Sequence, residues 1–119
     1  MLTLTLPYPP SVNSYLKTAN MTTRFISKKG LAFRSAVRMA VPANLEPMTG
    51  RLQVNVMLHA RDKIRRDIDN PLKILMDSLQ RAGVFKDDSQ IDKMLVERGD
   101  IIKGGMCIVT IEPYLKDEL

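Results

Sequence analysis

The sequence predicts an α/β fold of the α+β type, in which two helices cover a mixed β-sheet within a single small domain. Three observations predict this fold. A length of 119 residues suits one domain, so residues 1–119 are treated as a unit. Apolar residues alternate with polar ones in several short segments, and two longer segments place them at helical spacing. The resulting order of strand, helix, strand, helix, strand, strand is typical of helices packed on a sheet.

The first half of the chain predicts one main strand and one helix. Leucine and threonine alternate over residues 2–6, which indicates a half-buried strand that the following prolines end. Residues 15–26 are expected to form short extended segments. Ser27 is a suitable helix N-cap, and apolar side chains at helical spacing predict a helix from there to Pro42.

The second half begins with another strand and helix. Strict alternation over residues 52–59 predicts a strand. Asn70 followed by Pro71 predicts the start of the second helix, with Asn70 as its N-cap, because proline is well suited to the first helical position. Gly83 follows the last apolar residue of the helical stripe and is expected to end the helix.

The last two strands are expected to pair directly with each other. Residues 91–101 and 106–112 are both rich in apolar, strand-forming residues. Gly104 and Gly105 lie between them, and a short glycine turn is typical of an antiparallel hairpin. We therefore expect these two segments to be neighbours in the sheet.

The chain carries an excess of positive charge, with 18 Lys plus Arg against 13 Asp plus Glu. The net charge of +5 favours a polyanionic partner such as nucleic acid, but does not decide between binding and cutting. No apolar run approaches the roughly 20 residues of a membrane helix, and the start lacks the features of a secretory signal. The single cysteine, Cys107, is expected in the core. We expect a cytoplasmic protein with no membrane partner.

Basic side chains gather in two stretches that we expect to contact the DNA backbone. The first lies in the first predicted helix, where residues four apart share a face, although a solvated helix face explains it equally well. The second stretch precedes the second helix. Phosphate contacts set affinity and orientation rather than base sequence. The candidate DNA-binding residues are Lys28, Lys29, Arg34, Arg38, Arg61, Lys63, Arg65 and Arg66.

Acidic residues suggest a metal site at the start of the second helix. In an extended segment residues two apart point the same way, so Asp67 and Asp69 can face one point while Ile68 faces the core. A hard cation relieves the repulsion between two carboxylates, and magnesium prefers oxygen ligands. Asp87 and Asp88 are candidates for a third ligand, but spacing does not show that either returns to the first pair. Capping and turn formation also explain each aspartate taken alone.

The mixture of charges suits phosphodiester hydrolysis, which requires an activated water and neutralised charge on two oxygens. Lys73 lies near the start of the second helix, where it could contact the scissile phosphate. His59 is the only histidine, and strand alternation places it on the more polar face, so we expect a surface role. Composition and spacing leave a metal site and a set of caps and turns about equally supported.

Three segments resemble the RusA family of Holliday junction resolvases, which occur in bacteria, phages and prophages. Residues 6–13 read Leu-Pro-Tyr-Pro-Pro-Ser-Val-Asn, similar to the family's Leu-Pro-aromatic-Pro-Pro-Ser-x-Asn segment. Residues 66–70 read Arg-Asp-Ile-Asp-Asn, similar to its Arg-Asp-x-Asp-Asn helix start. Residues 82–91 contain Asp-Asp-Ser-Gln-Ile, similar to its Asp-Asp-x-Gln-Val/Ile segment. Each segment is weak alone, but the three in this order are specific and span nearly the whole chain.

The resemblance implies a crossover junction endonuclease that depends on Mg²⁺, with Mn²⁺ as a substitute, and needs no small-molecule cofactor. It implies a homodimer acting on four-way DNA junctions in recombination and repair, and paired nicks suit a two-fold dimer. The implied metal ligands and catalytic residues are Asp67, Asp69 and Asp88, joined in catalysis by Lys73. The choice of Asp88 over Asp87 comes from the resemblance.

Two other interpretations stay open. A non-catalytic nucleic-acid-binding protein would use the aspartates as caps and turns, and a nuclease for flaps or other branched DNA would use the same metal site. The chain also departs from the family pattern. Ile64 interrupts the arginine run before the aspartates, and Tyr8 stands where tryptophan is common. These departures leave the preference for junctions less defined than the catalytic residues.

Overall fold

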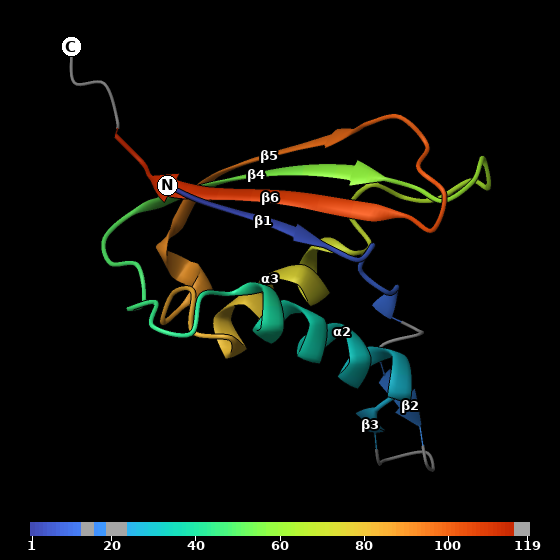
Figure 1. The fold of residues 1–119 in the computed structure, drawn as a ribbon, viewed down its shortest axis with the longest axis horizontal. Helices are drawn as coiled ribbons and strands as arrows, with labels where there is room; N and C mark the ends of the chain where they lie inside the picture. The colour runs from blue at the N-terminus through green and yellow to red at the C-terminus, as the bar shows by residue number, and fades with distance from the viewer. Residues whose placement is uncertain (13–15, 19–23, 116–119) are drawn as a thin grey trace.

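Two helices lie on one face of a four-stranded sheet in the computed structural model, which describes residues 1–12, 16–18 and 24–115 (Figure 1). The sheet contains β1 (Leu2–Leu6), β4 (Leu52–His59), β5 (Ile91–Arg98) and β6 (Met106–Pro113). The helices are α2 (Lys28–Ala40) and α3 (Leu72–Arg81), and a short 3₁₀ helix, η1 (Asp88–Gln90), precedes β5. Two short strands, β2 (Leu16–Thr18) and β3 (Arg24–Ile26), form a separate pair. These elements confirm the expected mixed sheet with two covering helices.

The four strands lie in the order β1-β6-β4-β5, and the sheet is mixed. β6 pairs antiparallel with both β1 and β4, whereas β4 and β5 run parallel. Parallel neighbours require a long crossover connection, which here contains α3. The β4, α3 and β5 segments therefore form a β-α-β unit, and α3 runs back beneath the sheet from the carboxyl end of β4.

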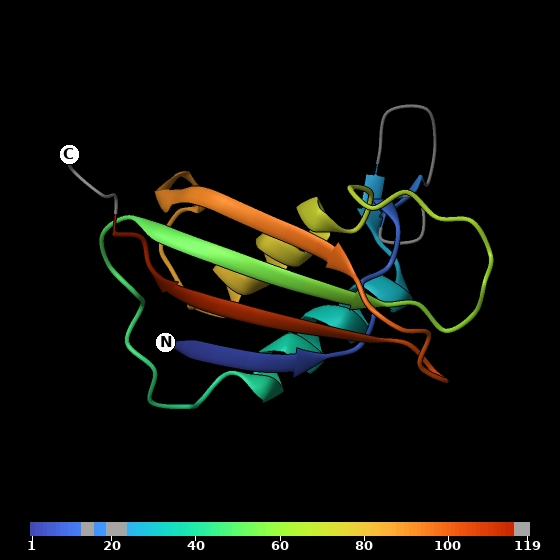
Figure 2. The same cartoon turned by 90° about the horizontal axis from the view of Figure 1, so that it is seen from above.

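The expected hairpin between the last two strands is wrong. Val56 of β4 pairs with Val96 of β5 on one side and with Val109 of β6 on the other, and Figure 2 shows β4 between the two strands. The crossover through α3 places β5 on one side of β4 and leaves the other side to β6. The glycine pair at residues 104–105, both with positive φ, instead shapes a loop that carries the chain past the end of β4. β5 also ends at Arg98, earlier than expected.

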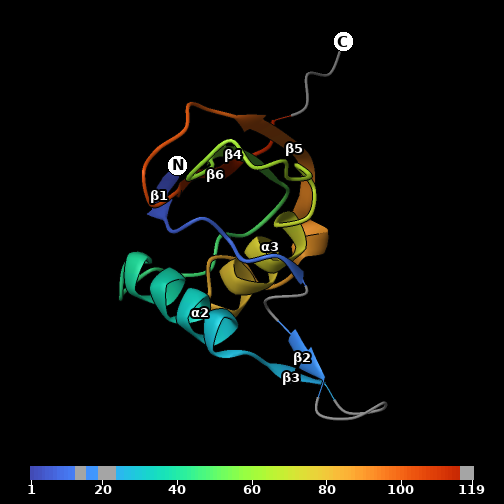
Figure 3. The ribbon, with the colours of Figure 1, turned by 90° about the vertical axis from the view of Figure 1, so that its right-hand side faces the viewer.

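The hydrophobic core lies between the sheet and the helices, which Figure 3 shows on the same side of the sheet. Alternate residues of β4 are buried, from Leu52 to Leu58, as their spacing predicts. Phe33 of α2 and Leu79 of α3 fill the space opposite them. Cys107 of β6 is fully buried, as expected, and burial raises the pKa of its thiol to about 12.

The two helices begin in different ways. The Ser27 side chain accepts a hydrogen bond from the first turn of α2 at 3.1 Å, which confirms the predicted cap. The expected capping role of Asn70 is wrong, because α3 begins at Leu72 without a side-chain cap. The Asn70 side-chain oxygen instead accepts the backbone N–H of Val12 at 3.2 Å. This contact ties the proline-rich N-terminal segment to the start of α3.

The remaining expectations concern the chain ends and the short extended segments. β2 and β3 pair antiparallel, which agrees with the extended structure expected over residues 15–26, but residues 13–15 and 19–23 lie outside the described part. Residues 116–119 also lie outside it. Among the described residues, no helix is both long enough and apolar enough to cross a membrane.

Candidate active site

The basic loop, defined here as residues 60–71, connects the carboxyl end of β4 to α3 and is organised by Asp62. The Asp62 carboxylate accepts hydrogen bonds from the Arg66 guanidinium at 2.8 Å and from the backbone N–H of Ile64 at 3.0 Å. These donors hold the pKa of Asp62 below its usual range. Arg61 adds a longer ion pair to the same carboxyl group at 3.4 Å. The loop is therefore a fixed turn of charged residues, although it is exposed.

β5 supplies a second anchor for the basic loop. The Arg98 guanidinium, at the end of β5, donates a hydrogen bond to the backbone carbonyl of Arg66 at 2.6 Å. A charge-assisted bond of this kind is stronger than a neutral one. It fixes the chain one residue before Asp67. No local pattern in the sequence indicates this contact, because its two partners are 32 positions apart.

Asp67 and Asp69 are both exposed at the end of the basic loop, and Ile68 between them packs against the core. The expected division of faces is confirmed, although the segment bends at residues 68–69 and is not a strand. Lys73 is exposed in the first turn of α3, where the helix dipole disfavours a cation and where no acidic residue lies. The helix dipole therefore does not account for Lys73.

The two aspartates before β5 differ in what they do. The Asp87 carboxylate accepts the backbone N–H of Ser89 at 2.9 Å, and the Gln90 side chain accepts the N–H of Asp87 at 3.2 Å. This capping box lowers the pKa of Asp87, chiefly through the N–H of Ser89. The Asp88 carboxylate is exposed, and its backbone N–H donates to the Gln80 side chain at 3.1 Å. Asp87 thus has a structural role that Asp88 does not share.

One chain does not bring Asp88 to the other two aspartates. Gln80, which holds the backbone of Asp88, lies in the last turn of α3, whereas Asp67 and Asp69 precede the first turn. The helix between them spans about 12 Å at about 1.5 Å per residue. Figure 1 shows the basic loop at one end of α3 and the turn into β5 at the other. Among the described residues, no three His, Cys, Asp or Glu side chains lie close enough to hold one metal ion.

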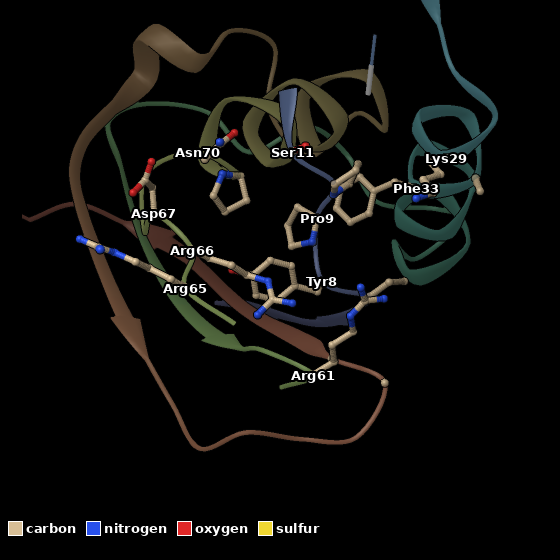
Figure 4. Close-up of a pocket in the computed structure, with 16 residues that line it drawn as sticks. Tyr8, Pro9, Ser11, Lys29, Phe33, Arg61, Arg65, Arg66, Asp67 and Asn70 are labelled. Carbon is tan, nitrogen blue, oxygen red and sulfur yellow. The ribbon is translucent and has the colours of Figure 1, made fainter. Parts of the chain in front are cut away.

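A cavity of about 820 Å³, here called the loop cavity, separates the basic loop from the start of α2. Figure 4 shows Tyr8 and Pro9 near its centre, with Arg66 beside Tyr8. Basic residues from α2 and the basic loop surround it, and Asp67 lies on its wall. Asp69, Lys73 and Asp88 do not line it. The arrangement combines apolar surface, positive charge and one of the candidate metal ligands in one hollow.

Comparison of the sequence with known proteins assigns the chain to a family. A protein-family model described as Endodeoxyribonuclease RusA matches residues 7–112. The crossover junction endodeoxyribonuclease rusA of Enterobacteria phage HK97 is 41% identical over 102 residues, which cover 84% of each chain. The crossover junction endodeoxyribonucleases RusA of Enterobacteria phage 82 and of Shigella sonnei are 34% and 36% identical over 110 residues, or 91% of each chain. The chain belongs to the RusA endodeoxyribonuclease family.

The RusA assignment confirms the resemblance seen in the three sequence segments. The matched region runs from the proline-rich segment to the end of β6, so it contains the basic loop, α3 and η1. All four predicted catalytic residues, Asp67, Asp69, Lys73 and Asp88, lie within it. Their roles in this RusA chain stay predictions.

Most of the predicted DNA-binding residues of this RusA chain are exposed, and Arg34 is the clearest departure. The Arg34 side chain is only 21% exposed and forms an ion pair with Asp77 of α3 at 3.4 Å. Arg81 also pairs with Asp77, at 3.1 Å. Arg34 therefore joins the two helices, and this structural role competes with the predicted DNA contact. The exposed members of the predicted set are Lys28, Lys29, Arg38, Arg61, Lys63 and Arg65, and Arg66 is partly buried against Asp62.

His59 has a packing role in the fold. Its Nδ1 lies 2.7 Å from the backbone carbonyl of Asp100, and its ring lies against Gly99. A Cβ added to Gly99 would come within 2.3 Å of the ring. The histidine thus helps to seat the segment after β5 beside the end of β4. It is half-buried, on the sheet face that its alternation predicts.

Proposed function

We propose that this RusA chain is a Mg²⁺-dependent endonuclease that resolves four-way DNA junctions by paired nicks, in recombination and repair. One observation carries the proposal: Asp67 and Asp69 are exposed together at the end of a cationic loop, in a family named for this activity. Carboxylate oxygens are hard ligands that suit Mg²⁺, and Mn²⁺ accepts the same donors. The relatives' names include crossover junction endodeoxyribonuclease, which supports the junction as substrate.

The proposed roles follow from position and charge. Asp67, Asp69 and Asp88 would hold the divalent ion, which when bound would activate a water and neutralise charge on the scissile phosphate. Lys73, at the positive end of α3, would contact a phosphate oxygen. The basic residues of the basic loop would bind the backbone on either side and offset the repulsion between DNA and the aspartates.

The site requires a homodimer, because one chain separates Asp88 from the other ligands by the length of α3. β5 pairs with β4 on one side only and forms an edge of the sheet among the described residues; it is mostly exposed along its eight residues, and such an edge can pair with another chain. Antiparallel pairing of β5 with its copy about a two-fold axis would set its Ile91 end against the Arg98 end of the copy. That arrangement would bring Asp88 of the partner subunit toward the basic loop, because Arg98 holds the residue before Asp67.

Cleavage of a synthetic four-way junction tests the proposed function. Wild-type protein with Mg²⁺ should introduce paired nicks in the junction and leave a linear duplex of the same sequence largely intact. Asp69→Asn should lower the rate by at least about a hundredfold, since it removes a metal ligand, while junction affinity is retained. Glu46→Gln, an exposed carboxyl group outside the site, is the matched control and should cut like wild type.

The alternatives predict different results in the same assay. A non-catalytic DNA-binding protein would bind the junction but never nick it with Mg²⁺ or Mn²⁺. A nuclease for flaps or other branched DNA would cut those substrates faster than a four-way junction. Equal cutting of linear duplex would exclude the resolvase and leave a general nuclease.

A further inference from the structure

The loop cavity combines apolar walls with a cationic rim, and the proposed metal site gives no role to its apolar surface. Its volume of about 820 Å³ lies in the range of pockets that enclose small molecules, about 300 to 1,000 Å³. Its walls are largely apolar, with Tyr8 and Pro9 from the N-terminal segment and Phe33 from α2. Its rim is cationic, with Lys29 from α2 and Arg61 from the basic loop. Flat apolar surface inside a ring of cations matches a nucleotide, whose base is apolar on its faces and whose phosphates are anionic.

Tyr8 is the residue best placed to meet a base. It is half-buried rather than part of the core, and it lines both the loop cavity and a second hollow of about 510 Å³ that the basic loop also lines. Figure 4 shows its ring among the arginines of the basic loop. Burial raises the pKa of its hydroxyl group, although Arg66 and Arg98 partly offset this effect, so the group stays protonated at neutral pH. Tyr8 thus presents a neutral ring in a positively charged setting.

The cavity is held open by contacts of the native fold. Pro9 is buried, and the Val12 N–H bond to Asn70 ties the proline-rich segment to the start of α3. Gly105, with φ +77°, passes so close to Tyr8 that a Cβ there would lie 3.1 Å from the Tyr8 Cβ. Prolines fix φ and lower the cost of ordering the segment. The surface is therefore largely preformed before any ligand arrives.

The cations of the cavity are suited to backbone phosphates. Lys29 forms no ion pair or hydrogen bond with the other described residues, so its charge is available to a ligand. Within residues 1–12, 16–18 and 24–115, Arg61 has a single long ion pair, with Asp62 at 3.4 Å. Lys29 and Arg61 come from different elements, α2 and the basic loop, and both line the cavity. Asp67 also lines the cavity, across from Lys29 and Arg61 in Figure 4, so a nucleotide held here would be next to the candidate metal site.

We infer that the loop cavity receives one unpaired nucleotide from the branch point of DNA, with its base against Tyr8 and its phosphates near Lys29 and Arg61. This inference rests on the proposed function and deepens it. A base costs least to extrude where it is unpaired or poorly stacked, and the branch point is where the continuous base stack of a duplex can be interrupted. The cavity would therefore favour branched over continuous DNA without reading a base sequence.

The affinity test compares Tyr8→Leu, which keeps apolar bulk but removes the flat ring, with Tyr8→Phe, which keeps the ring. Binding to a four-way junction and to a linear duplex is measured at one salt concentration, with Ca²⁺ in place of Mg²⁺. Tyr8→Leu should weaken junction binding by about tenfold, as expected for the loss of one stacked base, and leave duplex binding unchanged. Tyr8→Phe should bind like wild type. Tyr114→Leu, beyond the far end of β6, is the matched control and should also bind like wild type.

A photocrosslink locates the base directly. A 5-iodouracil is placed either at the branch point or within one arm of the junction, and the crosslinked peptide is identified by mass spectrometry. We expect the branch-point probe to crosslink to Tyr8 and the arm probe not to do so. Selective binding of the junction with no crosslink at Tyr8 and no loss in Tyr8→Leu would overturn the inference and leave the proposed function standing. Equal binding of junction and duplex by wild type would overturn both.

Discussion

At the scale of single residues, the structure separates charges that bind each other from charges that face solvent. Asp62, Asp77 and Asp87 each have partners that explain their presence. Asp67 and Asp69 are exposed, and the hydrogen bond from Arg98 to the Arg66 carbonyl fixes the chain directly before them. The helix dipole disfavours a cation at the position of Lys73, and departures from local stability rules are expected at functional positions.

The pH dependence of Asp62 tests the organisation of the basic loop. Its pKa in the folded state is depressed, so its contribution to stability is complete above the unfolded value of about 3.9 and is lost as pH falls through the folded value. NMR titration of the Asp62 carboxyl group should give a midpoint below about 3.9. Asp62→Asn should remove that titration and speed amide exchange at Ile64, whose N–H loses a charged acceptor. A midpoint at or above the ordinary value would show that Arg66 does not hold this carboxyl group in solution.

At the scale of elements, the sequence predicts the parts better than their pairing. Alternation over residues 52–59 and the stop at Gly83 define β4 and the end of α3, because both depend on neighbours along the chain. The hairpin of β5 and β6 is wrong because a glycine turn does not reveal the strand that comes between them. Asn70 misleads for the same reason, since its partner is 58 positions away.

In the candidate site too, the sequence predicts residues that belong to a local pattern and does not predict contacts between distant residues. Asp67, Asp69 and Lys73 can be chosen from the pattern around the helix start, and Asp88 from the family resemblance. Arg98 and Tyr8 cannot be chosen in this way, because their importance lies in contacts across the fold with the basic loop. The sequence also does not show that α3 keeps Asp88 apart from the other two aspartates.

Arg98 tests the link between β5 and the basic loop. Arg98→Met keeps most of the aliphatic side chain but removes the hydrogen bond to the Arg66 carbonyl. We expect junction cleavage to fall by about tenfold to a hundredfold, because small displacements of a catalytic group are costly. Global stability should fall by only about 1 kcal/mol, the net contribution of a typical hydrogen bond.

The matched control is Arg81→Met, which removes an ion pair to Asp77 on α3 but leaves the basic loop in place. It should cut the junction at close to the wild-type rate. Thermal unfolding monitored by circular dichroism separates loss of fold from loss of activity in both variants. Wild-type cleavage by Arg98→Met would show that the contact does not position Asp67.

At the scale of the whole molecule, the candidate metal ligands lie at opposite ends of α3, and the proposed function requires them in one site. The basic loop lies at one end and η1 at the other, and β5 leaves an edge of the sheet unpaired between them. The proposed two-fold dimer would turn the opposite ends of two chains toward each other and would supply two sites for two nicks. The central claim is therefore that each metal site is shared between two copies of the chain.

The measurement that tests this claim most directly is junction nicking by mixed variants. Asp69→Asn and Asp88→Asn should each be inactive alone, and the two proteins are unfolded together, refolded and assayed with Mg²⁺. In a shared site, a mixed dimer retains one site with Asp69 and Asp88 both intact, so nicking should return to about a quarter of the wild-type level under random pairing. A mixture of Asp67→Asn with Asp69→Asn is the control and should stay inactive, because those two residues lie on the same side of each site. No recovery in the first mixture, from variants that fold and form mixed dimers, would contradict the account.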